Sequence, residues 1–122
     1  MEKIEKTIKY TQLFNLYGVL LTDTQKDIFN DYFLLDLSLS EISENRSISR
    51  AAVEDALNKA IRKLDQYESE LHLLEKNTNI RSKIQQLREK TTDKEILNIL
   101  DELMEDVNNG IWEFDRETFK NL

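Results

Sequence analysis

The sequence contains no cysteine and no proline, and only two of its 122 residues are glycine. Without cysteine the chain can form no disulfide, offers no thiolate to a zinc ion and has no thiol nucleophile. Proline and glycine are the residues that most often end helices and build the turns of β-rich proteins. Their scarcity predicts long helices and an all-α fold.

Long apolar runs are also missing. No stretch approaches the ~20 apolar residues that a bilayer-spanning helix needs. The first ten residues, MEKIEKTIKY, alternate charged with apolar side chains and lack the apolar centre of a signal peptide. We therefore expect a cytoplasmic protein, and its 39% hydrophobic and 34% charged residues fit one modest globular domain.

Groups that carry out chemistry are few. His72 is the only histidine, and Glu68 and Glu75 are the acids one helical turn from it. Stable zinc sites usually need three or four ligands, so we expect no metal ion, and no motif indicates another cofactor. No glycine-rich phosphate loop or nucleophile–base spacing is present, and acid pairs such as Asp101 and Glu102 are typical of the charged side of an amphipathic helix. We expect a protein that is not an enzyme.

Acidic residues outnumber basic ones, which gives a formal net charge of −7. Residues 91–122 hold nine acidic and three basic residues, a net charge of −6 within the C-terminal quarter. Nucleic acid repels an acidic chain at long range unless the basic groups gather on one face.

Apolar residues recur at helical spacing along most of the chain. Three stripes of inward-facing residues are expected before residue 65: Ile4, Ile8, Leu13, Phe14, Tyr17, Leu20 and Leu21; then Ile28, Phe29, Tyr32, Phe33 and Leu35; then Val53, Ala56, Leu57, Ala60, Ile61 and Leu64. Thr22 with Gln25, and Ser38 with Glu41, have the spacing of capping boxes, and Ser49 can cap the helix after them.

The helix that begins near residue 49 has no obvious end at Leu64. Its first plausible break is the NTN at 77–79, so we expect a helix over 49–76, about 42 Å long at a rise of ~1.5 Å per residue. The apolar seam from Leu57 to Leu87 exceeds what one small core can cover and predicts a homodimer. Thr92 and Glu95 predict the start of a further helix, and large apolar groups near the end, Trp112 among them, predict docking.

These patterns predict two parts. A helix-turn-helix domain is expected over residues 1–76, with its motif at 38–64. Residues 77–122 are expected to form a helical C-terminal extension that belongs to the same domain or serves for dimerisation.

The motif is the stretch LSLSEISENRSISRAAVEDALNKAIRKL, residues 37–64. It has a short capped helix, a turn of about four residues and a longer capped helix, which is the layout of a helix-turn-helix. Ala52 and Ala56 are small enough to let the helices cross closely, and Ile48 is expected to fill the inside of the turn.

In such a motif the second helix enters the major groove of DNA. Its first residues face base edges, while nearby cations contact phosphates. The candidate nucleic-acid-binding residues are Arg50, Ala51 and Glu54 toward base edges, Arg46, Lys59, Arg62 and Lys63 toward phosphates, and Ser49 and Asn58 beside them. For Arg50 an ion pair with Glu54, four residues on, is the alternative.

Residues 13–64 resemble the YlxM family of small bacterial proteins, whose helix-turn-helix is similar to region four of sigma factors. The resemblance covers about the first 75 residues and rests on Leu13, Phe14, Tyr17, Leu20, Leu21, Thr22, Gln25, Ser38, Leu39, Glu41, Ile42, Glu44, Ser49, Arg50, Ala52, Val53 and Asp55.

This resemblance implies a DNA-binding or regulatory protein with a part in the signal recognition particle pathway, and no catalytic residue. The motif departs from the family pattern at Ser43, where Ala is usual, and at Arg46, where a large apolar residue is usual. Ser47 replaces a residue such as Gly, Ala51 a polar Gln and Glu54 a Tyr. The scaffold matches the family while the edge that would read bases differs.

Two functions fit these observations. The first is a non-enzymatic regulatory protein that binds DNA or the signal recognition particle RNA and works with signal recognition particle proteins. The second is a protein-interaction module on a helix-turn-helix scaffold that no longer binds nucleic acid.

Overall fold

All regular structure in the described part of the chain is helical. The computed structural model describes residues 3–110, and the predicted all-α class is confirmed. The elements are α1 (Lys3–Tyr17), the 3-10 turn η1 (Gly18–Leu20), α2 (Asp23–Phe29), the π-helical turn η2 (Asn30–Leu34), α3 (Leu39–Arg46), α4 (Arg50–Leu71), α5 (Leu73–Glu89), α6 (Lys94–Glu105) and the π-helical turn η3 (Asp106–Gly110). None of the helices described there is long and apolar enough to cross a membrane.

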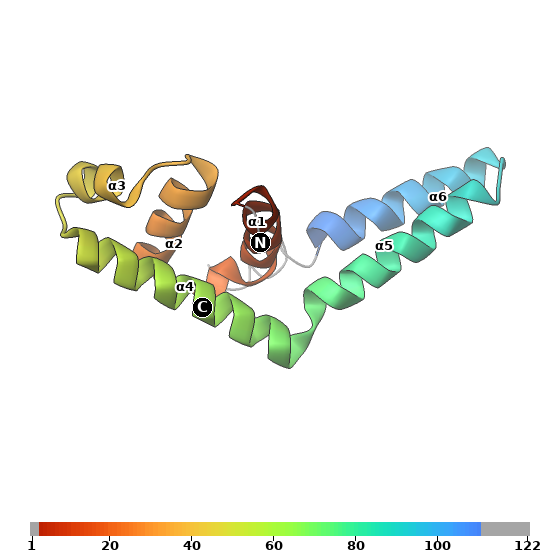
Figure 1. Ribbon diagram of the computed structural model, residues 1–122. Coiled ribbons are helices and arrows are strands. Elements are labelled where there is room, and N and C mark those ends of the chain that lie inside the picture. Colours follow the sequence, from red (N-terminus) through yellow and green to blue (C-terminus); the bar gives the residue numbers. More distant parts are fainter. Residues whose placement is uncertain (1–2, 111–122) are drawn as a thin grey trace, which may run out of the picture. The chain divides into compact units, whose positions relative to one another are not determined.

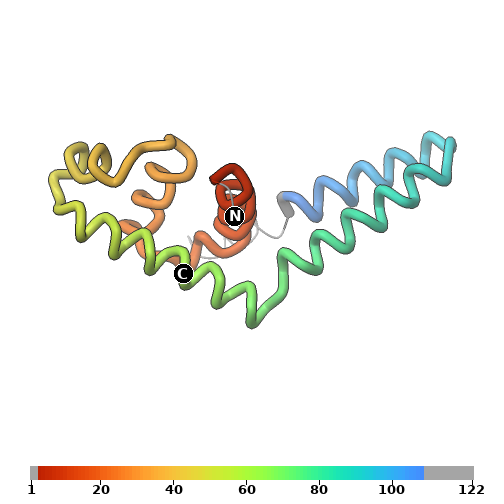
Figure 2. Tube along the Cα trace, in the orientation of Figure 1, coloured from red at the N-terminus to blue at the C-terminus, as the bar shows by residue number. Residues whose placement is uncertain are grey.

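The chain divides between Leu71 and His72 into two compact units, unit 1 (Met1–Leu71) and unit 2 (His72–Leu122). In unit 1, helices α1, α2 and α3 pack on one side of the long helix α4 (Figure 1). In unit 2, α5 and α6 run antiparallel and pack on each other as a hairpin (Figure 2). The predicted docking of Trp112 lies outside the described residues.

The core of unit 1 gathers one apolar stripe from each helix. Its buried apolar residues are Leu13, Tyr17, Leu21, Ile28, Phe29, Phe33, Ile42, Val53, Leu57, Ala60 and Leu64. Phe29 lies at the centre, with its ring stacked on Phe14 at 4.5 Å between centroids and tilted against Phe33 at 4.6 Å. Such ring contacts add to the stabilisation from burial alone.

Hydroxyl groups tie α1 to α4 along the edge of this core. The Tyr17 hydroxyl donates to Glu68 Oε1 at 2.7 Å, and the Tyr10 hydroxyl donates to Asp65 Oδ2 at 3.1 Å. Burial, followed by the charge of Asp65, raises the pKa of Tyr10 above its ordinary value. The helix α4 is therefore held to α1 by polar as well as apolar contacts.

The predicted stripes are wrong at their ends. Ile4, Ile8 and Leu20 are 71%, 56% and 40% exposed, and Leu35 is 63% exposed. Leu35 turns outward because η2 ends at Leu34 and the backbone reverses at Asp36, whose φ is 53°. Periodicity identified the stripes, but which turn of each helix reaches the core depends on how the helices cross.

The long helix ends earlier than predicted. It stops at Leu71, where His72 adopts a left-handed conformation with φ 57° and ψ 29°, and α5 begins at Leu73. The NTN at 77–79 lies inside α5 instead of ending a helix, and Asn77 is buried. The apolar seam predicted from Leu57 to Leu87 is therefore divided between the two units. Leu57 and Leu64 are buried in the core of unit 1, while Ile84 is buried in unit 2.

The start of α6 also differs from the prediction. Asp93, and not Thr92, is the capping residue, because its carboxylate accepts the amide hydrogens of Glu95 and Ile96 at 2.9 and 3.3 Å. A carboxylate at this position also interacts favourably with the positive end of the helix dipole.

Candidate nucleic-acid interface

The first helix of the motif begins and ends at serines. Ser38 and Glu41 form the predicted capping box, with backbone-to-side-chain hydrogen bonds of 3.1 Å in both directions. At the other end Ser47 takes the left-handed conformation, with φ 55°, which a helix end often gives to glycine. The Ser43 hydroxyl donates to the carbonyl of Ile48 at 2.5 Å and closes the turn. Two departures from the family pattern, Ser43 and Ser47, thus build this turn.

The second helix, α4, is capped by Ser49 as predicted. The Ser49 hydroxyl oxygen accepts the amide hydrogen of Ala52 at 3.0 Å. Two of the packing predictions for the motif are wrong, because Ile48 is 36% exposed and Ala52 is exposed. The inside of the motif is filled instead by Ile42 and Val53, both fully buried, because these longer side chains reach the core where α3 packs on α4.

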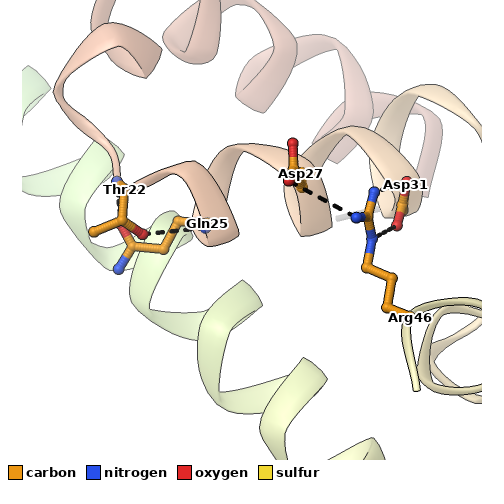
Figure 3. A network of polar contacts seen from close by, with 5 residues as sticks. All are labelled: Thr22, Gln25, Asp27, Asp31 and Arg46. Carbon is orange, nitrogen blue, oxygen red and sulfur yellow. Dashed lines mark hydrogen bonds and ion pairs between the residues drawn. The ribbon is translucent and has the colours of Figure 1, made fainter. Parts of the chain in front are cut away.

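Arg46 is bound by carboxylates of the fold at the surface of unit 1. Its Nε donates to Asp31 Oδ2 at 2.5 Å and its Nη2 donates to Asp31 Oδ1 at 3.1 Å, while Nη1 lies 3.7 Å from Asp27 Oδ2 (Figure 3). The Asp31 side chain is only 9% exposed, and a buried carboxylate needs such a partner. The hydrogen bonds to Asp31 raise the pKa of Arg46 above its ordinary value.

This arrangement gives Arg46 a structural role that sequence reasoning missed. Of the five cations predicted to contact nucleic acid, it is the one bound by two carboxylates of the fold. The only sequence signal for its partners is the spacing of Asp27 and Asp31, which places both on one side of the same helical segment.

Three other cations form what we call the basic patch: Lys59, Arg62 and Lys63 of α4. Their spacing of three and four residues places them next to one another on the helix surface. Lys63 donates to the side-chain oxygen of Gln25 on α2 at 3.4 Å. Lys59 lies 3.0 Å from Asp55 in an exposed pair, which contributes little stability and is easily exchanged for a phosphate contact. Arg62 is exposed and has no ion pair among the residues that the structure describes.

Arg50 and Ala51 lie exposed in the first turn of α4. The alternative expected for Arg50 was an ion pair with Glu54, and that pair is not formed between these two described side chains. Arg50 thus extends the positive charge of α4 toward the start of the helix, where the backbone amides also attract anions.

Glu54 lies one helical turn after Arg50, and Asn58 lies one turn after Glu54. They line a pocket of about 490 Å³ together with side chains of α1, η2 and α3, which include Lys3, Lys6 and Tyr32. Lys3 is held near the pocket by Asp36 at 2.5 Å, and this hydrogen bond raises the pKa of Lys3. The nine candidate residues therefore form three groups. Arg46 is bound by Asp31 and Asp27, and Glu54 and Asn58 lie at the pocket. The third group is Ser49, Arg50, Ala51 and the basic patch.

Metal-binding groups do not gather within residues 3–110. No cluster of three or more His, Asp or Glu side chains with the geometry to hold a metal ion occurs there. His72 lies 3.3 Å from Glu75, and both side chains are exposed.

The fold and the capped α3–turn–α4 unit define a helix-turn-helix protein. Residues 4–105 match the family described as "Putative helix-turn-helix protein, YlxM / p13 like" (UPF0122), and the chain belongs to this family. The resemblance found over residues 13–64 is thereby confirmed, and the match extends beyond the first 75 residues.

Similar proteins come from several bacteria. The UPF0122 protein of Thermoanaerobacter sp. strain X514 is 39% identical over 104 residues, which cover 80% of this chain and 89% of that protein. The UPF0122 protein of Fusobacterium nucleatum is 32% identical over 101 residues, covering 83% and 98%. A protein named as a probable UPF0122 member in Mycoplasma mycoides is 40% identical over 91 residues, covering 75% and 80%.

Proposed function

We propose that this protein is a non-enzymatic regulatory protein that binds nucleic acid through α4. The observation that carries the proposal is the placement of Arg50 and the basic patch on a helix whose motif keeps both its caps and its turn. A cation whose charge is not already neutralised by the fold gains most from a phosphate, because contact releases counterions from the nucleic acid.

The family resemblance supports a place for this activity in the signal recognition particle pathway, in the cytoplasm. The ligand is then duplex DNA or the signal recognition particle RNA, and signal recognition particle proteins are the expected partners. The homodimer and the two-part division at residue 76 stay predictions.

The candidate residues differ in how accessible their side chains are to nucleic acid. Arg62, Lys59, Lys63 and Arg50 contact phosphates, with Ser49 and Ala51 near the backbone or base edges. Glu54 repels phosphate, and together with Asn58 it lines a pocket. Arg46 is bound to Asp31 and is a positioning residue for the motif. The expected binding is therefore dominated by phosphate contacts, with little base discrimination.

The test is fluorescence anisotropy with labelled duplex DNA and with the signal recognition particle RNA, from about 50 to 200 mM salt. Four phosphate contacts predict a slope of about −3 to −4 for log affinity against log salt. The variant Arg62→Glu/Lys63→Glu is compared with Lys76→Glu/Lys94→Glu, which makes the same charge change on exposed residues of unit 2.

Comparing the two variants distinguishes phosphate contacts made by α4 from a general effect of the protein's net charge. We expect the α4 variant to lose at least about tenfold in affinity near 150 mM salt, and the control to lose much less. Equal losses in both variants, or binding that disappears at physiological salt, would overturn the proposal.

The second function, a protein-interaction module, is favoured by a specific observation. Two of the candidate nucleic-acid-binding residues, Glu54 and Asn58, line a pocket with Lys3 and Lys6. If this function holds, the charge reversals on α4 leave nucleic-acid binding at background, and Glu54→Lys weakens capture of signal recognition particle proteins while Arg62→Glu/Lys63→Glu does not.

A further inference from the structure

Five of the large apolar side chains described in unit 2 are exposed. On α5, Ile80 and Leu87 are 43% and 53% exposed. On α6, Ile96, Ile99 and Leu103 are 46%, 56% and 43% exposed. Only Ile84 and Leu100 are buried apolar residues among those described in this unit. We call the five exposed residues the apolar hairpin face.

Helix geometry places these five residues on one side of the hairpin. Arg81, Ile84 and Arg88 of α5 point toward α6, as do Leu97, Leu100 and Met104 of α6 toward α5, which their burial reflects. At 100° per residue, Ile80 and Leu87 lie about 80° around α5 from the residues that point toward α6. Ile96, Ile99 and Leu103 lie about 100° around α6, in the same rotational sense, from the residues that point toward α5. Because the helices are antiparallel (Figure 2), these two flanks belong to the same side of the hairpin.

The two helices carry opposite charge. Between Leu73 and Glu89, α5 has four basic and two acidic residues. Between Lys94 and Glu105, α6 has one basic and four acidic residues. A surface that is basic along one edge and acidic along the other complements a rotated copy of itself.

We propose that the apolar hairpin face is the dimerisation surface of this protein, and that it is occupied by the same face of a second copy. A two-fold axis parallel to the helices places α5 of one copy over α6 of the other, so that basic meets acidic at both edges. A two-fold axis across the helices would place α5 on α5 and α6 on α6, which brings like charges together. The dimer is therefore a four-helix bundle in which every neighbouring pair of helices is antiparallel.

The proposed dimer predicts an ion pair across this interface. Arg81 donates to Asn108 at 3.1 Å, and Arg88 pairs with Asp101, so residues of α5 and α6 whose numbers add up to 189 lie at matching heights along the hairpin. Lys83 and Asp106 share one such height. Lys83 borders Ile80 and Leu87, and Asp106 borders Leu103, and both are exposed. In the dimer, Lys83 of one copy faces Asp106 of the other.

The test uses the full-length chain. Sedimentation velocity from about 1 to 200 µM measures the dissociation constant. The variant Ile99→Asp/Leu103→Asp places carboxylates on the apolar hairpin face, and its matched control is Leu34→Asp/Leu35→Asp, which makes the same change at exposed leucines of unit 1. Circular dichroism confirms that each variant keeps its helices.

We expect a dimer for the wild type and for the control, and at least about a 100-fold weaker association for the hairpin variant. A wild-type chain that is monomeric throughout this range would overturn the proposal, and the face would then belong to residues 111–122 or to another protein. A dimer that persists in the hairpin variant would also overturn it, because the interface would lie elsewhere.

A charge exchange tests the orientation separately. Lys83→Glu and Asp106→Lys should each weaken the dimer several-fold, and the double variant should recover most of the loss. Losses that simply add in the double variant would exclude the arrangement with α5 over α6.

Discussion

Unit 1 and unit 2 are both built from amphipathic helices, but they bury their apolar stripes to different extents. In unit 1 three helices cover one side of α4, and eleven apolar residues are buried. In unit 2 two helices form a single layer, and only Ile84 and Leu100 are buried among the described apolar residues. An apolar stripe is buried only where another element packs against it. In a two-helix hairpin each helix packs against one other helix, so apolar residues on the sides of each helix stay exposed.

The two proposals assign different roles to the two units. Unit 1 has a closed core, so its exposed face, α4 with its cations, is free to serve as a binding surface. Unit 2 has the apolar hairpin face, which is its proposed dimerisation surface. Residues that serve stability should therefore concentrate in unit 1, and residues that serve association in unit 2.

The largest effect on stability is expected from the core of unit 1. Leu64→Ala removes a fully buried side chain of α4 and should lower the free energy of unfolding by about 2–5 kcal/mol. Leu35→Ala, at a leucine that is 63% exposed, should change it by less than about 0.5 kcal/mol. Urea unfolding followed by circular dichroism measures both. Similar losses in the two variants would contradict the closed core assigned to unit 1.

The next effect concerns the polar side of unit 1. Arg46→Met removes both hydrogen bonds to Asp31, whose side chain is 9% exposed, and should cost roughly 1–3 kcal/mol because the carboxylate loses its partner. Lys59→Met breaks only the exposed pair with Asp55 and should cost less than about 0.5 kcal/mol.

The same pair of variants should give the reverse order in nucleic-acid binding. Lys59→Met should weaken binding, and Arg46→Met should leave the affinity of the folded protein unchanged. Anisotropy well below the melting temperature checks this, and a larger binding loss for Arg46→Met would show that Arg46 contacts phosphate after all.

A smaller effect tests the start of α6 in unit 2. Asp93→Ala removes the cap that accepts two amide hydrogens and should cost about 1 kcal/mol. Thr92→Ala, at the residue that the sequence pattern favours as the cap, should have almost no effect. Hydrogen exchange of the α6 amides distinguishes the two, and equal changes in exchange would favour the capping role predicted for Thr92.

The smallest effect concerns the junction between the units. His72 has a φ of 57°, which glycine adopts without strain, so His72→Gly should raise the free energy of unfolding by up to about 1 kcal/mol. Gln66→Gly, at an exposed position within α4, should instead lower it by about 1 kcal/mol. Thermal unfolding of both variants measures the sign. A loss in His72→Gly would indicate that the helix is continuous through residue 72.

Much of the local structure followed from local signals. The boxes at Thr22 and Ser38 and the cap at Ser49 are formed as predicted, because a cap requires only a hydrogen bond between residues two or three apart. The helix-turn-helix followed from the pattern of residues 37–64, and the family from residues within 13–64. By contrast, the break at His72 and the cap at Asp93 were missed, since neighbouring residues, NTN and Thr92, carry signals that are equally good locally.

The site was predicted only in part for a similar reason. Spacing placed Lys59, Arg62 and Lys63 together, because all three lie on one helix. It could not show that Arg46 binds Asp31, fifteen residues away, or that Glu54 shares a pocket with Lys3.

The sequence by itself determined the helical class, the motif, its caps and the stripes that face inward, because each depends on interactions within one helix or one turn. The tertiary structure alone decided which cations the fold neutralises, where α4 ends and which apolar residues stay exposed. These outcomes depend on contacts between segments far apart in the chain, and a pattern read along one segment contains no information about what packs against it.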